Sequence, residues 1–366
     1  MTFFYVCDNI IIMKEIVKEL NKNGYDAFIV GGYVRDYLLG INSTDIDICT
    51  NAPIDKVSKI FNGRGKLFKE YFSYHIEEDG YTYNITTFRK EGKYKKNKPI
   101  EITKAKDLGT DLLRRDFTIN TFAIDNAGRL IDILGAKKDL DSRIIKVVGD
   151  TDKKLTEDKT RIIRAIRFAC TLDFDLSPEI LDFISKKSYY LNEVPKDYKR
   201  KELDKIFDSI NVDKFFYFIK RFDIAKYFNI KYDKLYKAYN KYGIWAQLET
   251  DLPFTKKEKE LLSDIRKIVE SKDIHLSDLM MYDNEVVYNA AAILKLENKL
   301  KTMEEMIKLH SIIDLDITPD LLMKYCKLKD IKRAYKLIER NVMEGLLENN
   351  IDEIEMFLRD MKLWVI

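Results

Sequence analysis

The sequence predicts an α+β head, built on a mixed sheet with helices, followed by an all-α remainder. Over about the first 140 residues, short alternating segments typical of strands mix with segments of helical period. Nine of the 14 glycines lie before residue 110, so turns are concentrated in this part of the chain. From about residue 150 onward, the sequence is poor in glycine and rich in Lys, Glu, Leu and Ile at helical spacing. A chain of 366 residues also exceeds one ordinary hydrophobic core, so we expect several domains.

The elements of the head are expected in a definite order. They are a helix over 11–20, a strand over 25–30, a turn at Gly31-Gly32, a helix over 33–39, a strand over 45–50, and a hairpin of 66–75 with 81–89. Asn23-Gly24 ends the first helix, and Asp79-Gly80 forms the turn of the hairpin. We place the head at 1–140 and helical segments at 141–210, 211–275 and 276–366.

The composition argues against several classes of protein. With 64 basic and 61 acidic residues the net charge is +3, which neither demands nor excludes a nucleic-acid partner. The four cysteines form no CxxC pair and the three histidines lack metal-ligand spacing, which argues against a disulfide framework and a zinc cluster. We recognise no secretory leader and no run of 18 apolar residues, so we expect no membrane association and a reducing, cytoplasmic location. No protein partner is implied.

One segment, 211–243, concentrates basic charge. It contains eight Lys or Arg and three Asp, and tyrosines and phenylalanines are interleaved with the lysines. Basic groups neutralise phosphates and aromatic rings stack on bases, so this segment is a candidate RNA surface. The same pattern also fits a solvated helix face over core aromatics, and helical period alone does not separate the two interpretations.

The strongest local signal is the stretch GGYVRDYLLGINSTDIDICT, residues 31–50. Gly31 and Gly32 lie between a strand and a helix, where backbone N–H groups can approach an anion without a Cβ in the way. Arg35 follows one turn into that helix and is a candidate phosphate ligand. Asp45 and Asp47 alternate along the next strand, so both carboxylates project from one face and can converge on hard cations such as Mg²⁺. Two such cations activate a hydroxyl nucleophile and stabilise a pyrophosphate leaving group.

Residues 28–170 resemble the tRNA nucleotidyltransferase/poly(A) polymerase family in its bacterial-type (class II) form, and the rest of the chain resembles it loosely. Four segments carry the resemblance, in the family's order: FIVGGYVRDYLLG with STDIDICT, LLRRDFTINTFAID, LIDILGAKKDLDSRIIKVVGD, and EDKTRIIRAIRFA. The resemblance implies a nucleotidyltransferase head at 1–140, a base-recognising neck at 141–210, a body at 211–275 and a tRNA-binding tail at 276–366. In RRDFT it implies that Arg115 and Asp116 face the sugar and phosphates of the incoming nucleotide.

The fourth segment is expected to read the base. Asp158, Arg161 and Arg164 are spaced by three residues, which makes them neighbours on a helix. A carboxylate accepts and a guanidinium donates, so Asp158 with Arg161 matches the amino group and ring nitrogen of cytosine or adenine. Uracil and guanine present the reverse pattern and are rejected. Arg167 continues the spacing, and the resemblance adds it to the nucleotide-binding set.

Two positions depart from the family pattern. Asn84 stands where relatives often have a glutamate, and Thr160 replaces a proline that is common after the Glu-Asp pair. Between them, the segment 89–100 (RKEGKYKKNKPI) is expected to be a mobile, charged loop. The resemblance places a flexible loop here. The loop has its full length in this sequence, which favours complete CCA addition. We expect the loop to act as a lever that re-aims Asp158 and Arg161 from cytosine to adenine. A plain surface hairpin loop is the alternative.

These expectations combine into one function. A tRNA 3′-OH attacks the α-phosphate of CTP or ATP and releases pyrophosphate, with Mg²⁺ held by Asp45 and Asp47. The alternatives within the family are a poly(A) polymerase and an enzyme that adds only CC or only A. The alternative from another class is a non-catalytic RNA-binding protein.

Overall fold

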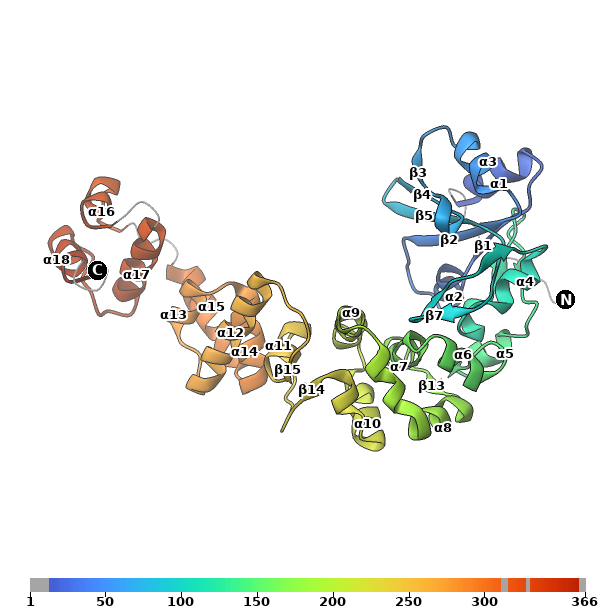
Figure 1. Cartoon of the computed structure of the whole chain (residues 1–366). Helices are drawn as coiled ribbons and strands as arrows, with labels where there is room; N and C mark the ends of the chain where they lie inside the picture. The colour runs from blue at the N-terminus through green and yellow to red at the C-terminus, as the bar shows by residue number, and fades with distance from the viewer. Residues whose placement is uncertain (1–12, 311–314, 327–329, 362–366) are drawn as a thin grey trace. The chain divides into compact units, whose positions relative to one another are not determined.

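The computed structural model describes residues 13–310, 315–326 and 330–361 (Figure 1). The chain divides into two compact units, Met1–Phe228 and Asn229–Ile366. This division lies inside the segment 211–275, for which the sequence predicts a single body domain. Within the described ranges, no helix is long and apolar enough to cross a membrane.

A seven-stranded mixed sheet forms the centre of the head, in the order β11-β10-β1-β2-β5-β4-β3. β2 pairs with β5 in parallel, and the other neighbouring strands pair antiparallel. The strands are β1 (Ala27–Val30), β2 (Asp45–Thr50), β3 (Gly65–Phe68), β4 (Ser73–Glu78), β5 (Tyr81–Thr87), β10 (Ala123–Ile124) and β11 (Leu130–Ile131).

One face of this sheet is covered by helices. The head helices are α1 (Met13–Lys22), α2 (Gly32–Leu38), α3 (Ile54–Ile60), α4 (Leu108–Leu113) and α5 (Lys137–Asp141), with 3-10 turns η1 (Lys69–Tyr71) and η2 (Thr118–Asn120). α1 and the end of α3 lie on the covered face, whereas α4 packs on the opposite face against Val30 and Cys49. Ile46 of β2 and Tyr83 of β5 are fully or almost fully buried on the covered face. Phe61, at the end of α3, stacks on Tyr74 of β4 with ring centroids 6.3 Å apart. Apolar residues at alternate positions of the strands therefore hold the helices on this side.

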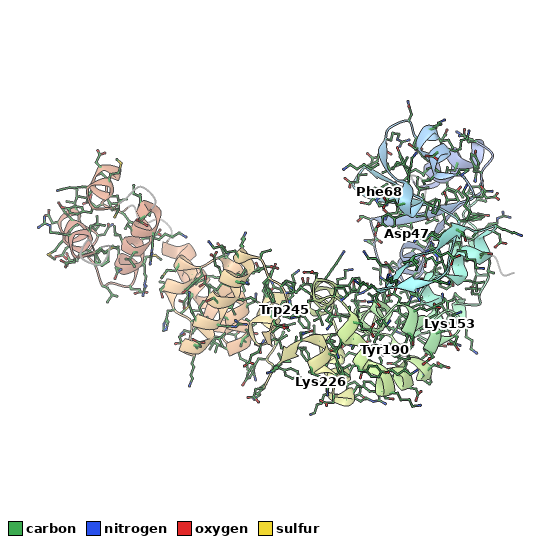
Figure 2. The ribbon with its side chains drawn as sticks, viewed as in Figure 1. Asp47, Phe68, Lys153, Tyr190, Lys226 and Trp245 are labelled. Carbon is green, nitrogen blue, oxygen red and sulfur yellow. The ribbon has the colours of Figure 1, made fainter. Side chains whose placement is uncertain are left out.

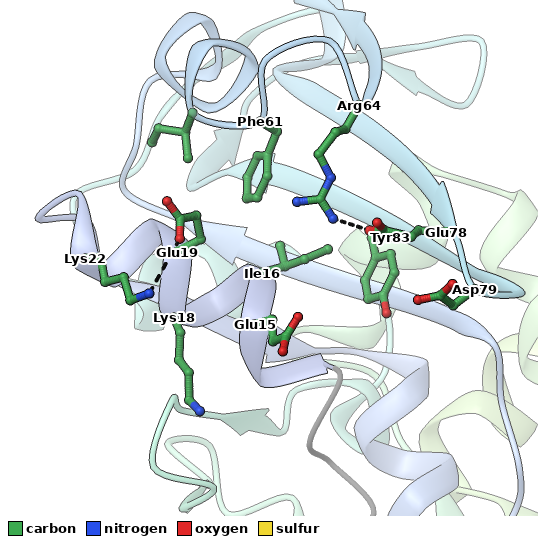
Figure 3. Close-up of a pocket in the computed structure, with 11 residues that line it drawn as sticks. Glu15, Ile16, Lys18, Glu19, Lys22, Phe61, Arg64, Glu78, Asp79 and Tyr83 are labelled. Atoms are coloured by element: carbon green, nitrogen blue, oxygen red, sulfur yellow. Dashed lines mark hydrogen bonds and ion pairs between the residues drawn. The ribbon is translucent and has the colours of Figure 1, made fainter.

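A cavity of about 480 Å³ lies on the covered face, between α1, the end of α3 and the β4–β5 hairpin (Figure 3). Ile16, Phe61 and Tyr83 line it together with charged side chains. Arg64 and Glu78 form an ion pair at its rim. Tyr83 pairs in register with Ile46, so its side chain points away from the sheet face that carries Asp45 and Asp47.

Most of the predicted elements of the head are confirmed. β2 matches the strand predicted over 45–50, and α2 matches the helix predicted over 33–39 to within one residue. α1 begins at Met13, and residues 11 and 12 of the predicted first helix lie outside the described residues. The hairpin turn at Asp79-Gly80 is confirmed, with φ of 51° and 78° at the two positions.

The single strand predicted over 66–75 is wrong. β3 ends at Phe68, η1 follows, and Phe72 takes a left-handed φ of 52° before β4 begins at Ser73. The chain reverses at this point, so β3 and β4 pair antiparallel with each other. The apolar and aromatic run hides this turn, because it contains no glycine or proline to mark it.

The segment 89–100, expected as a loop, is a hairpin. β6 (Arg89–Glu91) pairs with β9 (Ile102–Lys104), and β7 (Tyr94–Lys95) pairs with β8 (Lys98–Pro99). Lys96 and Asn97 have φ of 50° and 62°, the backbone of a tight two-residue turn. The segment therefore has the hairpin form of the alternative interpretation, and its expected mobility stays a prediction.

The remainder of the first unit is mainly helical. It contains α6 (Thr151–Glu157), α7 (Thr160–Thr171), α8 (Pro178–Lys187), η3 (Ser188–Glu193), α9 (Lys196–Phe207), α10 (Val212–Phe222) and η4 (Ala225–Phe228), with β12 (Ile144–Ile145) parallel to β13 (Asp175–Leu176). Phe168 of α7 packs edge-on against Phe117 of the head, with ring centroids 5.6 Å apart. Head and neck thus share an apolar contact next to the candidate site.

The second unit is also helical. It contains β14 (Ile230–Lys231) paired with β15 (Glu249–Thr250), then α11 (Lys241–Ala246), α12 (Lys256–Ser271), α13 (Leu276–Met281), α14 (Asn284–Leu294), α15 (Glu297–His310), α16 (Pro319–Tyr325), α17 (Ile331–Met343) and α18 (Ile351–Met361). The last three helices share a core that includes Leu322, Ile338 and Ile354. The helical expectation for the chain after the head is confirmed, apart from the two short strand pairs.

The basic segment 211–243 has a mixed character. It crosses the division between the units at Phe228. Phe215 and Phe218 are buried core residues, whereas Tyr217 is 56% exposed and Tyr239 is 61% exposed. Buried core aromatics are therefore confirmed for part of the segment, and an RNA surface at the exposed tyrosines stays a prediction.

Candidate active site

Asp45 and Asp47 lie at the start of β2, on the sheet face opposite to that of Ile46. Asp45 is exposed, Asp47 is half-buried and Ile46 between them is fully buried. Asn84 of β5 lies directly beside Asp47 in the parallel register and donates from Nδ2 to Oδ1 of Asp45 at 2.6 Å. The sheet therefore sets both carboxylates on one face with an amide, in place of a third carboxylate, next to them.

Asp47 sits against the glycine turn and Arg115. A Cβ added at Gly31 would lie 2.9 Å from Nη1 of Arg115 and 2.9 Å from Oδ2 of Asp47, and the φ of Gly31 is 80°. Only glycine fits both the backbone angle and this gap. Burial raises the pKa of Asp47, and the negative charge of Asp45 raises it further. The positive charge of Arg115 opposes this rise.

Arg115 is held by a carboxylate that the sequence analysis missed. Asp111 of α4 is completely buried and lies 3.5 Å from Nη2 of Arg115 and 2.9 Å from Nε of Arg114. Burial alone would raise the pKa of Asp111, but the two guanidinium groups lower it below its ordinary value. The sequence does contain a signal for Asp111, because it precedes two consecutive arginines by three and four residues, the spacing of ion pairs on a helix.

Asp116 is saturated with hydrogen bonds. Its Oδ1 accepts from the backbone N–H of Phe117 at 2.8 Å and from Nδ2 of Asn120 at 3.1 Å. Its Oδ2 accepts from Arg164 of α7, through Nε at 2.9 Å and also through Nη2. Burial opposes ionisation, but these donors outweigh it and lower the pKa of Asp116 well below its usual range. The pair joins head to neck.

Arg35 does not point to the carboxylates of β2. Its side chain is buried, and it donates to Oδ1 of Asp36 at 2.7 and 2.9 Å and to Oδ1 of Asn120 at 2.6 Å. Its guanidinium lies 4.8 Å from the ring centre of Phe168. Asn120 therefore bridges Arg35 and Asp116, and sequence reasoning gave no signal for this role because an isolated Asn in a motif is not informative.

Asp158 is not on a helix, which corrects the predicted i,i+3 arrangement. It lies between α6 and α7, with φ −134° and ψ 97°. Its Oδ1 accepts from the backbone N–H of Thr160 at 3.0 Å and from the Thr160 hydroxyl at 2.5 Å. A proline at 160 would lack that N–H, so the departure from the family pattern supplies a local cap. Arg161 and Arg164 do lie on α7, and Nε of Arg161 is 3.7 Å from Asp158.

Arg161 is held by the hairpin. It is 5% exposed, donates from Nη1 to the carbonyl of Lys154 at 2.9 Å, and donates from Nη2 to the hydroxyl of Tyr94 at 2.9 Å. That hydroxyl in turn donates to Oε2 of Glu91 at 2.6 Å. Tyr94 was not singled out from the sequence, because its contact with Arg161 is entirely long-range.

Further contacts dock the turn of the hairpin on the neck. Asn97 accepts from the backbone N–H of Lys159 at 3.0 Å and donates to the carbonyl of Glu193 at 3.0 Å. Glu91 at the base of the hairpin accepts from Nη1 of Arg114 at 3.1 Å. A continuous chain of contacts therefore runs from Arg115 through Asp111, Arg114, Glu91 and Tyr94 to Arg161.

Lys154 connects the same two regions by a second route. Its Nζ donates to the carbonyl of Leu113 at 2.9 Å and to that of Arg114 at 3.1 Å, at the end of α4. Its own carbonyl accepts from Arg161. Burial, and then the charge of Arg161, lower the pKa of Lys154 to about 8.

Arg167 lies away from the β2 carboxylates. It donates from Nε to Oε2 of Glu202 at 2.7 Å, and its guanidinium lies 3.7 Å from the ring centre of Phe168. Glu202 is 2% exposed, so Arg167 neutralises a carboxylate buried between α7 and α9.

The head presents two carboxylates on a mixed sheet, beside a glycine turn and an arginine. Residues 27–146 match the family model described as the poly A polymerase head domain. Over these residues the chain is similar to the tRNA nucleotidyltransferase/poly(A) polymerase family.

Part of the chain is also similar to CCA-adding enzymes. The CCA-adding enzyme of Bacillus pumilus (strain SAFR-032) is 39% identical over 192 residues, which are 52% of this chain and 48% of the relative. That of Staphylococcus aureus (strain MRSA252) is 35% identical over 215 residues, 58% of this chain and 54% of the relative. The chain thus spans about half the length of the curated relatives it matches. The crystal structure of the Bacillus stearothermophilus CCA-adding enzyme in complex with CTP shares the fold, with a TM-score of 0.79 at 21% identity over 98% of this chain and 99% of that chain.

Proposed function

We propose that this protein is a CCA tRNA nucleotidyltransferase, which adds or repairs the 3′-terminal CCA of tRNA from CTP and ATP without a nucleic-acid template. The observation that carries the proposal is the contact of Asp47, Gly31 and Arg115 on the open face of β2. It sets a carboxylate pair beside a glycine turn and a cation, the groups that a metal-bound triphosphate requires. The likeness to CCA-adding enzymes supports the choice of substrates.

The β2 carboxylates suit Mg²⁺. Hard divalent cations prefer carboxylate oxygens, and Asp45 with Asp47 offers two on one strand face. Burial is the main cause of the raised pKa of Asp47 and the charge of Asp45 adds to the rise, so a cation between the two carboxylates would favour their ionised forms. Bound Mg²⁺ would supply activation of the 3′-hydroxyl and charge neutralisation on the leaving pyrophosphate.

The triphosphate would lie against Gly31, Gly32 and Arg115. Among the described residues, Nε of Arg115 is a buried donor that has no hydrogen-bond partner, although Arg115 lies beside Asp47. An unpaired buried donor is costly, and a phosphate oxygen would satisfy it. Arg35 donates to Asn120, and its Nη2 would lie 3.5 Å from a Cβ at Gly32, so phosphate binding by Arg35 stays a prediction.

The sugar and base would meet the head–neck boundary. Four donors already surround the two oxygens of Asp116, so a ribose hydroxyl binds there only by displacing one of them. Asp158 and Arg161 would read the base edge, Asp158 as acceptor and Arg161 as donor. Arg161 is fixed by Tyr94 and Lys154, so the template is pre-organised for C and A and unfavourable for U and G.

A cytoplasmic location is part of this proposal. Cys49 and Cys170 are buried free thiols, as expected for a reducing compartment.

Incubation of the full chain with [α-³²P]CTP, ATP, Mg²⁺ and a tRNA transcript lacking its last three residues tests the function. We expect labelled product that lengthens by three residues and then stops. Unlimited A addition indicates a poly(A) polymerase, and a product shorter by one or two residues indicates partial addition. Binding of tRNA without any incorporation would reject the enzymatic proposal.

A further inference from the structure

A single row of side chains crosses four strands on the open face of the head sheet. Asp47 of β2 is paired with Asn84 of β5, Asn84 with His75 of β4, and His75 with Lys66 of β3. Residues that are directly paired project on the same side of a sheet. The row therefore extends from the proposed metal carboxylate to the far edge of the sheet.

Phe68 lies beside the outer end of this row. It pairs with Ser73, two residues from His75, and its ring centre is 4.6 Å from that of the imidazole. Phe68 is 40% exposed, so part of its ring is accessible to a ligand. Figure 2 labels Phe68 and Asp47 on the same head. We name Lys66, Phe68 and His75 the acceptor ledge.

The two sides of Asp47 differ. On the β1 side the same face is covered, because Val30 and Cys49 pack with Leu108 and Leu112 of α4 in a buried core. Gly31 and Arg115 also contact Asp47 from the glycine turn and the end of α4. The triphosphate is therefore assigned to that side, and the β5–β4–β3 side is left for the second substrate.

The geometry of phosphoryl transfer places the second substrate opposite the leaving group. The attacking and leaving oxygens lie roughly in line on the transferred phosphorus. With pyrophosphate toward Gly31 and Arg115, a 3′-hydroxyl must approach from the side of Asn84 and His75. His75 is two strands from Asp47, about 10 Å, which leaves room for one nucleotide.

We propose that the acceptor ledge binds the unpaired 3′-terminal nucleotides of the RNA acceptor. Phe68 and His75 form a stacking surface for a base, which tolerates any sequence because each base has an aromatic face. Lys66, an exposed cation beside His75, pairs with a backbone phosphate. Asp45 and Glu77 both pair with Thr82, in the row next to that of His75 and on the side away from Phe68. Their negative charges would repel a phosphate from that side and favour its position near Lys66. This inference rests on the proposed function and names the subsite for its second substrate.

The test uses the full chain and a tRNA transcript that lacks its last three residues and ends in 2-aminopurine. Stacking on the ledge quenches the fluorescence of this base, and Phe68→Ala or His75→Ala should remove most of the quenching. Both variants should raise the KM for the RNA about 10-fold and leave the KM for CTP unchanged within about two-fold. Phe68→Tyr should restore both values. Tyr189→Ala removes a comparably exposed ring, 49% exposed, from the neck and should behave as wild type.

The outcomes separate the two proposals. If wild type incorporates CMP but neither variant changes the fluorescence or the RNA KM, the ledge is refuted and the proposed function stands. If wild type quenches the terminal base but incorporates nothing, the ledge stands as an RNA site and the proposed function fails. Quenching that survives in both variants places the terminal base elsewhere.

Discussion

Arg161 donates from Nη2 to the hydroxyl oxygen of Tyr94 over 2.9 Å, although the two residues are 67 positions apart in the sequence. The contact fixes one donor of the proposed base-reading arginine on a hairpin of the head. The hydroxyl of Tyr94 donates in turn to Glu91, so this hydroxyl links the guanidinium of Arg161 to a carboxylate. Recognition of the base in the neck is thereby tied to the conformation of the hairpin.

Removing this hydroxyl should disturb base recognition more than stability. Tyr94→Phe leaves Nη2 of Arg161 as a buried donor without its partner, a cost of about 1–3 kcal/mol. We expect kcat/KM for both CTP and ATP to fall about 10-fold or more, because the template is no longer pre-organised. Steady-state kinetics with each nucleotide measure it, and Tyr189→Phe is the control. Wild-type kinetics in Tyr94→Phe would show that the hydrogen bonds of the Tyr94 hydroxyl to Arg161 and Glu91 do not contribute to catalysis.

The lysines of the hairpin should act separately from its anchor. Lys93, Lys95, Lys96 and Lys98 are exposed, and replacing all four by Ser retains Tyr94 and Asn97. If the basic hairpin is the lever for the switch from C to A, C addition stays near wild type and the product ends one residue short. Sequencing gels resolve these products. If the variant adds the terminal A at the wild-type rate, the lysines are not needed, and the growing RNA end must itself cause the change from C to A.

Loss of either β2 carboxylate should abolish catalysis. Asp45→Ala or Asp47→Ala removes a proposed Mg²⁺ ligand and should reduce incorporation of both nucleotides by ~10³-fold or more. Circular dichroism should show an intact fold. Asp79→Ala, at the exposed β4–β5 turn, is a control that removes a carboxylate from the same domain. Near wild-type turnover in an Asp45/Asp47 double variant would overturn the assignment.

Asp158 should control the exclusion of uracil. In Asp158→Ala the amino group of C or A loses its acceptor, while Arg161 remains able to donate to a carbonyl, so UTP should compete better. Thr160→Ala is a matched control, because it removes the hydroxyl contact but retains the carboxylate and the backbone N–H. Competition assays with UTP measure the effect. Equal discrimination in wild type and Asp158→Ala would place the template elsewhere.

Stability should respond to pH through Lys154. Burial, and then the charge of Arg161, lower its pKa from 10.5 to about 8, while Glu91, Glu157 and Asp116 oppose the lowering. Between about pH 8 and 10.5 the folded state therefore binds fewer protons than the unfolded state, so this group adds stability as pH rises. The free energy of unfolding of wild type relative to Lys154→Met should increase over that window. A difference that is constant from pH 7 to 10.5 would contradict the lowered pKa.

RNA affinity should depend on the second unit. A chain that ends at Phe228 retains the first unit and should keep nucleotide binding, but its tRNA affinity should fall more than about 10-fold. This end point is preferable to one near residue 210, because Phe215 of α10 packs on Phe207 in the same unit. Binding of the full chain should also weaken steeply with salt. Normal tRNA binding by the folded shorter chain would exclude the second unit from the RNA surface.

The sequence by itself determined the local elements that carry the site. Alternation along residues 45–50 fixed β2 and the common face of Asp45 and Asp47, and the consecutive glycines fixed the turn before α2, because strand period and glycine backbone freedom are local properties. Only the tertiary structure decided which distant groups meet them. The register of β3 and β4 brings His75 and Phe68 onto the carboxylate face, and docking of the hairpin brings Tyr94 to Arg161. Pairing between strands and packing of a hairpin on a helix depend on residues far apart in the chain, which no local pattern records.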